Sequence, residues 1–208
     1  MRAHLPLIGI LASILLLLLA TTYYPGGTAE SPNTVGYNWA QNFISILFSP
    51  TAFNGAANPA RRVAIPAWFV LCLSVALMFR NISRKGTSKF QKKAIEIGGI
   101  GAAIYAFLVV TPMHNLLITI SLLFFVPAVL AVLHLLYIEH QMRLLWAGVI
   151  CFTLLTISAA MYYGNALWSL LPVAQKLTIA LYLGWLVVLQ YVDFRRQPGK
   201  KMFPKAWG

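Results

Sequence analysis

The longest polar interval of the chain reads GGTAESPNTVGYNWAQNFISILFSPTAFNGAANPARR and covers residues 26–62. Apolar runs long enough to cross a membrane lie on both sides of it. Pro25, Gly26 and Gly27 end the apolar run that precedes the interval, because proline lacks an N–H donor and glycine tolerates any φ. The interval therefore separates the first predicted membrane span from all the others.

Residues 38–49 of this interval have the pattern of a mostly apolar helix with one narrow polar edge. At about 100° per residue, a single stripe collects the polar side chains, which are Asn38, Gln41, Asn42, Ser45 and Ser49. One interpretation is a helix at the membrane interface with its polar edge toward water. The other is a helix docked on the bundle with that edge inward, above a cavity lined by amide and hydroxyl groups. Asn54 and Asn58 follow in a turn-rich run.

The composition indicates a polytopic membrane protein. Of the 208 residues, 60% are hydrophobic and only 10% are charged, and the mean hydropathy is +0.75. Soluble domains of this size carry far more charge. The net charge of +12 would suggest a nucleic-acid partner for a soluble protein, but the basic residues stand in short segments beside the apolar runs. There they indicate orientation and contact with anionic lipids, so we expect no nucleic-acid partner.

Six apolar runs predict an all-α membrane bundle that forms a single domain over residues 1–208. The predicted spans are residues 5–24, 63–79, 94–110, 116–138, 144–163 and 171–191. The outer loop at residues 25–62 is expected to carry the short extra amphipathic helix, and residues 193–208 form a basic tail. A cleaved signal peptide is the alternative for the first run. The apolar run is about 20 residues long and no small-residue cleavage site follows it, so we favour a retained helix.

The basic residues predict the orientation of the chain. Residues 80–93 carry six Lys or Arg and no acid, and short loops with such an excess stay on the cytoplasmic side. With six spans and both termini cytoplasmic, thirteen of the sixteen Lys and Arg fall on that side, and the exceptions are Arg61, Arg62 and Lys176. We therefore expect a multi-pass protein of the cell inner membrane, with anionic lipids at the basic loop and tail.

This topology brings seven polar residues to the non-cytoplasmic face. The candidates for one ligand-binding pocket are Asn42, Ser45, Asn54, Asn58, Thr111, His114 and Asn115. His114 is the only one of them that titrates near neutral pH, which makes it the candidate catalytic residue, with Ser45 as the candidate nucleophile. The plainer alternative is a histidine that simply starts a helix at the membrane surface.

The histidines do not predict a metal site. His114 and His134 are separated by about 30 Å along one helix at about 1.5 Å per residue, so they cannot share an ion. His134 and His140 lie on the wrong faces for a chelating pair. His4 and His134 share a leaflet and could ligate a haem, but no other residue supports one. We expect no metal and no cofactor.

Three landmarks stand in a fixed order along the chain. The first span ends in YPGG, the outer loop contains NFISILF and FNGAAN, and the fourth span opens with TPMHNL. This order resembles a six-helix bacterial and archaeal membrane family catalogued as a domain of unknown function, number nine hundred and ninety-eight. Asn42 and Ser45 match its Asn-x-x-Ser-Asp-Leu-Gly segment, whereas Ile46 and Phe48 replace the acid and the glycine. The resemblance implies a small all-helical bundle, and the two replacements weaken any catalytic assignment.

Three functions stay open at this point. The first is an integral membrane protein whose non-cytoplasmic pocket binds a lipid or an amphipathic ligand. The second is a membrane-embedded lipid hydrolase or transferase that uses His114 and Ser45, and a carboxylate close to His114 would favour it. The third is a small subunit of a larger membrane complex, with a membrane-protein partner.

The orientation can be tested with an impermeant thiol reagent on intact cells. A Ser88→Cys variant changes the basic loop and is expected to resist labelling, whereas an Ala29→Cys variant changes the outer loop and is expected to react. Cys72 and Cys151 fall near the middle of predicted spans, so they give little background. Labelling at position 88 together with protection at position 29 would overturn the topology.

Overall fold

The computed structural model of the chain describes residues 4–164 and 167–192, and its regular structure is helical. The helices are α1 (Leu5–Thr22), α2 (Arg61–Ser83), α3 (Lys89–Leu108), α4 (His114–Ile138), α5 (Met142–Tyr163) and α6 (Leu171–Tyr191). Two short 3₁₀-helices, η2 (Ile44–Phe48) and η3 (Trp168–Leu170), lie in the connections. These ranges contain no strand, only isolated β-bridges from Gly26 to Val35 and from Thr51 to Ala57. The predicted basic tail at residues 193–208 lies outside the described residues.

Five of the described segments are long and apolar enough to cross a membrane. They are Leu5–Thr22, Arg61–Ser83, His114–Ile138, Met142–Tyr163 and Trp168–Tyr191. The chain is therefore a multi-pass helical membrane protein. Helix α3 differs from the five because Lys89, Lys92, Lys93 and Glu96 occupy its first two turns.

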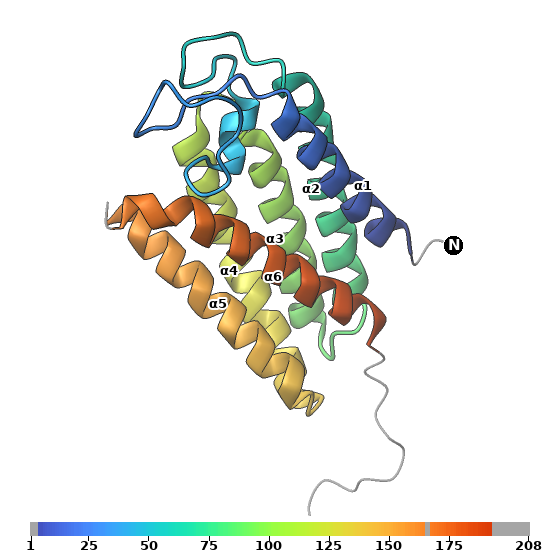
Figure 1. Ribbon diagram of the computed structural model, residues 1–208. Helices are drawn as coiled ribbons and strands as arrows, with labels where there is room; N and C mark the ends of the chain where they lie inside the picture. Colours follow the sequence, from blue (N-terminus) through green and yellow to red (C-terminus); the bar gives the residue numbers. More distant parts are fainter. Residues whose placement is uncertain (1–3, 165–166, 193–208) are drawn as a thin grey trace, which may run out of the picture.

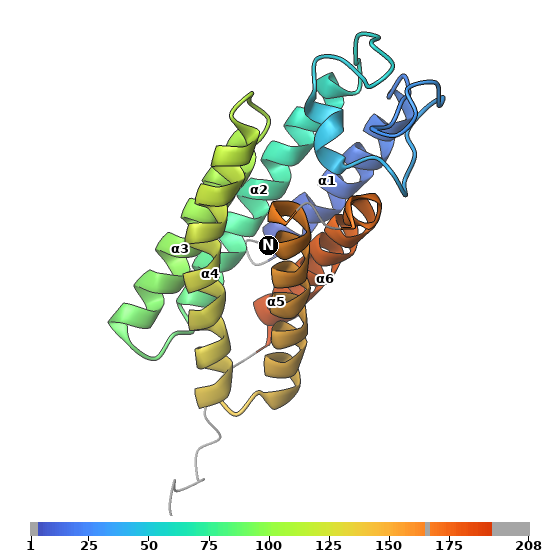
Figure 2. The same ribbon diagram turned by 90° about the vertical axis from the view of Figure 1, so that its left-hand side faces the viewer.

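The helices fall into two groups (Figure 1 and Figure 2). Helices α1 to α4 lie side by side in chain order, and α5 and α6 form a hairpin placed across them. We call the end of the bundle that carries residues 23–60 the outer end, these residues the outer segment, and the opposite end the inner end. At the inner end, Lys85 Nζ donates hydrogen bonds to the carbonyl oxygens of Leu189, at 2.7 Å, and Val192, at 2.6 Å. These bonds help to satisfy the last carbonyls of α6, which have no partner within the helix.

Helix α3 packs closely against both of its neighbours where it carries glycine. A Cβ atom at Gly98 would lie 2.9 Å from the Cβ of Ala128 in α4, and one at Gly99 would lie 2.1 Å from the ring of Phe79 in α2. Neither position has room for a side chain. The small residues repeated every four positions in this helix predict such close contact.

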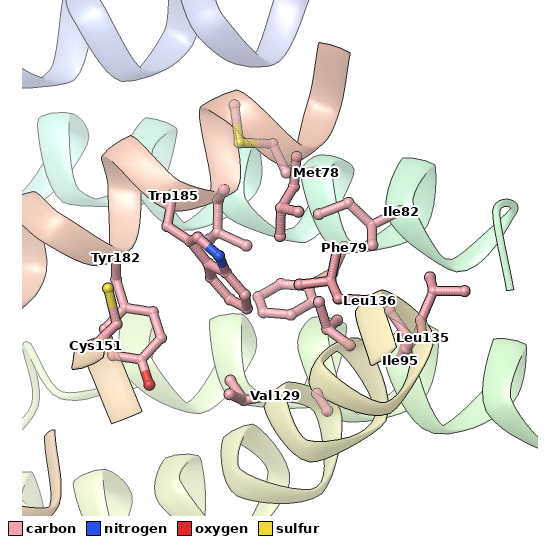
Figure 3. Packing of buried hydrophobic residues seen from close by; sticks show 14 of the residues in the cluster. Met78, Phe79, Ile82, Ile95, Val129, Leu135, Leu136, Cys151, Tyr182 and Trp185 are labelled. Carbon is pink, nitrogen blue, oxygen red and sulfur yellow. The ribbon is translucent and has the colours of Figure 1, made fainter. Parts of the chain in front are cut away.

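Two groups of buried side chains hold the bundle together. The larger one contains side chains from all six α-helices, most of them from α2, α4 and α6, and includes Phe79, Ile82, Leu135, Leu136 and Trp185 (Figure 3). The second lies at the outer end and packs Leu47 and Phe48 of the outer segment with Ala20 of α1 and Ala64 of α2. The outer segment is therefore docked on the bundle by apolar contacts. Cys72 and Cys151 are both buried and unpaired.

The outer segment differs from the α-helix expected at residues 38–49, and that prediction is wrong. The structure has a turn at residues 39–41 and then η2, a 3₁₀-helix of five residues. The side-chain oxygen of Asn38 accepts a hydrogen bond from the Ala40 N–H at 2.9 Å, and that of Asn42 accepts one from the Asn38 N–H at 2.9 Å. Asparagine side chains that bond to nearby backbone in this way compete with helix formation.

Helix α3 begins before its predicted span of residues 94–110, because Ser88 caps it. The Ser88 hydroxyl accepts a hydrogen bond from the Gln91 N–H at 3.1 Å, and the Gln91 side-chain oxygen accepts one from the Thr87 N–H at 2.8 Å. A serine followed three residues later by glutamine is a common start of a helix. The cap therefore places Lys89 to Lys93 on the helix instead of in a loop.

Candidate functional site

Asn42 ties the outer segment to the bundle. Its side chain is fully buried, and its Nδ2 donates a hydrogen bond to the Gly27 carbonyl oxygen at 2.9 Å, while its Oδ1 accepts the bond from Asn38. Its backbone oxygen accepts a hydrogen bond from the Tyr37 hydroxyl at 3.0 Å and another from the Lys176 ammonium group of α6. One residue thus connects two parts of the outer segment and links both to α6.

Two tyrosines reinforce this connection. The Tyr24 hydroxyl donates to the Gly27 carbonyl at 3.3 Å and accepts from the Phe53 N–H at 3.2 Å. Burial raises the pKa of both the Tyr24 and the Tyr37 phenols, because it disfavours the charged form. Both hydroxyls therefore stay neutral donors at physiological pH.

Asn58 ties the C-terminal end of η2 to the start of α2. Its Nδ2 donates to the carbonyl oxygens of Ile46, at 3.1 Å, and Ser49, at 2.9 Å. Its Oδ1 accepts from the Ala60 N–H at 3.2 Å, directly before α2 begins. Asn58 therefore satisfies the end of η2 and the start of α2 at once.

These contacts place η2 between α2 and α6. The Ile44 N–H donates to the side-chain oxygen of Gln175 in α6 at 3.2 Å. On the other side, the Phe48 ring packs on Trp68 of α2 with the ring centroids 5.4 Å apart. Ser45 lies between these two contacts in the sequence.

A cavity of about 650 Å³ lies beside η2, with its main walls from α4, α5 and α6, and with Trp68 of α2 and Ala106 of α3 also lining it. Its α4 wall consists of His114, Asn115, Ile118, Ser121 and Leu122. Spacings of three and four residues put these side chains on one face of the helix. At about 1.5 Å per residue, the wall runs about 12 Å along α4 from His114 to Leu122. The cavity therefore reaches from the outer end into the membrane-spanning part of the bundle.

The deep hydroxyl groups of the cavity bond to the protein itself. Ser121 donates to the Ala102 carbonyl oxygen at 2.9 Å, and the hydroxyls of Ser158 and Thr178 lie 3.2 Å apart. Their neighbours in the walls are apolar and include Leu155 and Ile179. The inner part of the cavity therefore presents a mainly apolar surface.

Polar groups that can bind a ligand gather at the outer end of the cavity. The Asn115 side-chain oxygen accepts from the Tyr162 hydroxyl at 2.6 Å and lies 3.2 Å from His114 Nδ1. Among the described residues, no hydrogen-bond partner is found for the Ser45 hydroxyl or for the amide nitrogen of Gln175. None of the described residues that line the cavity is an Asp, Glu, Lys or Arg. An uncharged hydrogen-bonding group fits this end.

The structure divides the seven predicted site residues into two sets. Ser45, His114 and Asn115 line the cavity together. The other four are not among its lining residues: Asn42 and Asn58 are buried in contacts within the outer segment, and Asn54 and Thr111 are exposed. Of the polar stripe, Ser45 lines the cavity, whereas Asn42 is buried and bonds within the outer segment. A ligand-binding role for these residues stays a prediction.

The α5 and α6 walls were missing from the sequence prediction. They contribute Ser158, Ala159 and Tyr162 from α5, and Gln175 and Thr178 from α6. The available signal was a row of small and polar residues, three or four positions apart, on helices that are otherwise apolar.

Neither a protein-family model, nor a curated protein, nor a solved structure matches the chain. The resemblance to the six-helix family therefore stays a prediction. Within the described part of the chain, no three His, Cys, Asp or Glu residues gather closely enough to hold a metal ion. The functional argument rests on the geometry and chemistry of the cavity.

The role of Asn42 can be tested by unfolding. Asn42→Leu removes the shorter of the two hydrogen bonds to the Gly27 carbonyl and leaves the Asn38 N–H without its partner, so we expect the free energy of unfolding to fall by about 1–3 kcal/mol. The measurement is a denaturant titration in mixed micelles followed by tryptophan fluorescence. Asn33→Leu is the matched control because Asn33 is exposed, and it is expected to change little. Equal effects of the two variants would contradict the buried role of Asn42.

Proposed function

We propose that this chain is an integral protein of the cell inner membrane whose outer cavity binds a lipid or another amphipathic ligand with an uncharged polar group. The observation that carries the proposal is the cavity itself, with an apolar inner part, a polar outer end and no Asp, Glu, Lys or Arg among its described lining residues. Its volume of about 650 Å³ falls within the range of small-molecule sites, roughly 300–1,000 Å³.

The proposed orientation places the cavity on the non-cytoplasmic side. Two observations support it: the basic cluster of residues 80–93 spans the end of α2, the turn and the start of α3, and Arg143 lies in the first turn of α5. Both of these regions lie at the inner end of the bundle, opposite the outer segment (Figure 1). Loops rich in Lys and Arg stay in the cytoplasm.

We further propose that α3 is the sixth transmembrane helix. Its 20 residues span about 30 Å, enough for the hydrocarbon layer. Its charged residues are confined to the first two turns, where long side chains can reach the headgroups. Its glycine contacts with α2 and α4 support a place inside the bundle.

The ligand would lie with its apolar part against Ile118, Leu122 and Leu155, and with its polar group beside Ser45 and Gln175. The apolar part gains from leaving water, at roughly 25 cal/mol for each Å² buried. The hydroxyl of Ser45 and the amide nitrogen of Gln175 supply hydrogen bonds that orient the polar group. A headgroup with a full negative charge would find no cation among these side chains, and burying an unpaired charge is costly.

A lipid hydrolase or transferase is the second candidate, because Ser45 and His114 line the same cavity. His114 Nδ1 faces the side-chain oxygen of Asn115 at 3.2 Å, and an asparagine can orient a catalytic histidine. Activation of a serine by histidine is usually assisted by a carboxylate, and none lies among the described cavity residues. This composition favours binding over catalysis.

The proposal can be tested by filling the cavity from α5. Ala159 lines the cavity, whereas the neighbouring Ala160 is exposed on the same helix. We expect Ala159→Trp to abolish the lipid that copurifies with the protein, as measured by mass spectrometry of extracts, and Ala160→Trp to retain it. Retention in both variants would contradict the proposal.

The same assay separates the two functions. A lipid that stays intact during incubation with the purified protein supports binding. Cleavage or transfer that Ser45→Ala or His114→Ala abolishes would establish the enzyme instead.

A further inference from the structure

A second hollow lies at the inner end of the bundle, where the first turn of α1 meets the last turns of α2. Its volume is about 350 Å³, and its lining residues are Leu5, Pro6, Leu77, Arg80, Asn81 and Arg84. We call it the inner groove. Half of these residues are apolar, and the other half carry nitrogen donors that suit a phosphate group.

The two arginines lie on the same side of α2. They are four residues apart, which puts their side chains one above the other on a helix. Both are exposed. The closest approach of Arg80 to an acid is 3.7 Å, from its Nε to an Oε1 atom of Glu96, and the two side chains are 55% and 42% exposed. Exposed pairs of this kind bind weakly, so Glu96 does not neutralise the groove. Arg84 forms no ion pair within the described part of the chain.

Guanidinium groups recognise phosphate through two parallel hydrogen bonds, which a single point charge cannot provide. The Asn81 amide adds a neutral donor between the two arginines. Leu5, Pro6 and Leu77 supply an apolar surface beside these donors. A ligand that satisfies both halves carries a phosphate next to hydrocarbon.

The level of the groove along the bundle suits a lipid headgroup. It lies at the beginning of one membrane-spanning helix and the end of another. Arginines at such helix ends extend their charged groups into the interface. In the orientation proposed above, this is the cytoplasmic leaflet, where anionic lipids attract basic segments.

We propose that the inner groove binds the phosphate group of an anionic phospholipid, with Arg80 and Arg84 as the charged ligands and Asn81 as an additional donor. This site is separate from the outer cavity. The two differ in chemistry, because the described lining of the outer cavity has no Lys or Arg. The chain would then hold two lipids of different charge at its two ends.

The proposal can be tested with the full-length protein in nanodiscs of phosphatidylcholine into which phosphatidylglycerol of the same acyl chains is titrated. Native mass spectrometry of lipids retained after release measures the preference for phosphatidylglycerol. The double variant Arg80→Gln, Arg84→Gln is expected to reduce this preference about tenfold, which corresponds to about 1.4 kcal/mol for the pair, because both charges are partly screened by water. The double variant Arg80→Lys, Arg84→Lys keeps the charge but not the paired hydrogen bonds, and we expect a several-fold reduction.

The matched control is the double variant Lys89→Gln, Lys93→Gln. It removes two exposed cations, also four residues apart, from the same end of the bundle but outside the groove. We expect it to keep the preference of the unaltered protein, and an equal loss in this control would overturn the site in favour of general attraction. A full preference in either arginine variant would overturn it as well. Inorganic phosphate at an equal concentration is expected to leave the lipid bound, and displacement by phosphate would contradict a lipid ligand.

Discussion

The outer segment has almost no regular structure, yet it is packed onto a helical bundle, so its backbone N–H and C=O groups need partners outside helices and strands. Turns and two β-bridges supply some of these partners, and side chains supply others. Asn42, Asn58 and Tyr24 supply the side-chain partners that join distant parts of the segment: together they bond to backbone groups of Gly27, Asn38, Ile46, Ser49, Phe53 and Ala60. These bonds hold the segment in one shape, and that shape sets η2 between α2 and α6. The position of the cavity therefore depends on two asparagines and a tyrosine that do not line it.

The environment of the α5–α6 hairpin differs between its inner half and its outer half. In its inner half, Trp185 is buried in the main core and its indole N–H donates to the Leu144 carbonyl oxygen at 2.9 Å. In its outer half, Ser158, Ala159 and Thr178 face the cavity instead of packed side chains. An apolar chain bound there would pack against these walls as side chains pack in protein interiors, and the apolar surface that it covers would favour binding.

The helices could be predicted because runs of about 20 apolar residues have few alternatives in a membrane. Their ends were less predictable, since the Ser88 cap and not hydropathy decides where α3 begins. The helix at residues 38–49 was wrong because an amphipathic pattern does not show whether asparagines bond to water or to nearby backbone. The predicted topology alone was enough to suggest that His114 and Ser45 lie at one site. Gln175 was missed, because its spacing of three residues from Thr178 marks a polar face of α6 but does not show which neighbour that face meets.

The central claim is that an acyl chain or a similar apolar group occupies the outer cavity. The most direct measurement is crosslinking with a diacylglycerol that carries a photoreactive diazirine at the end of one acyl chain, with the modified residues located by mass spectrometry. The account predicts modification of Ile118, Leu122 and Leu155, which line the cavity. Modification confined to Leu123, Ile150 and Ile157, which are exposed on the outside of the same helices, would contradict it.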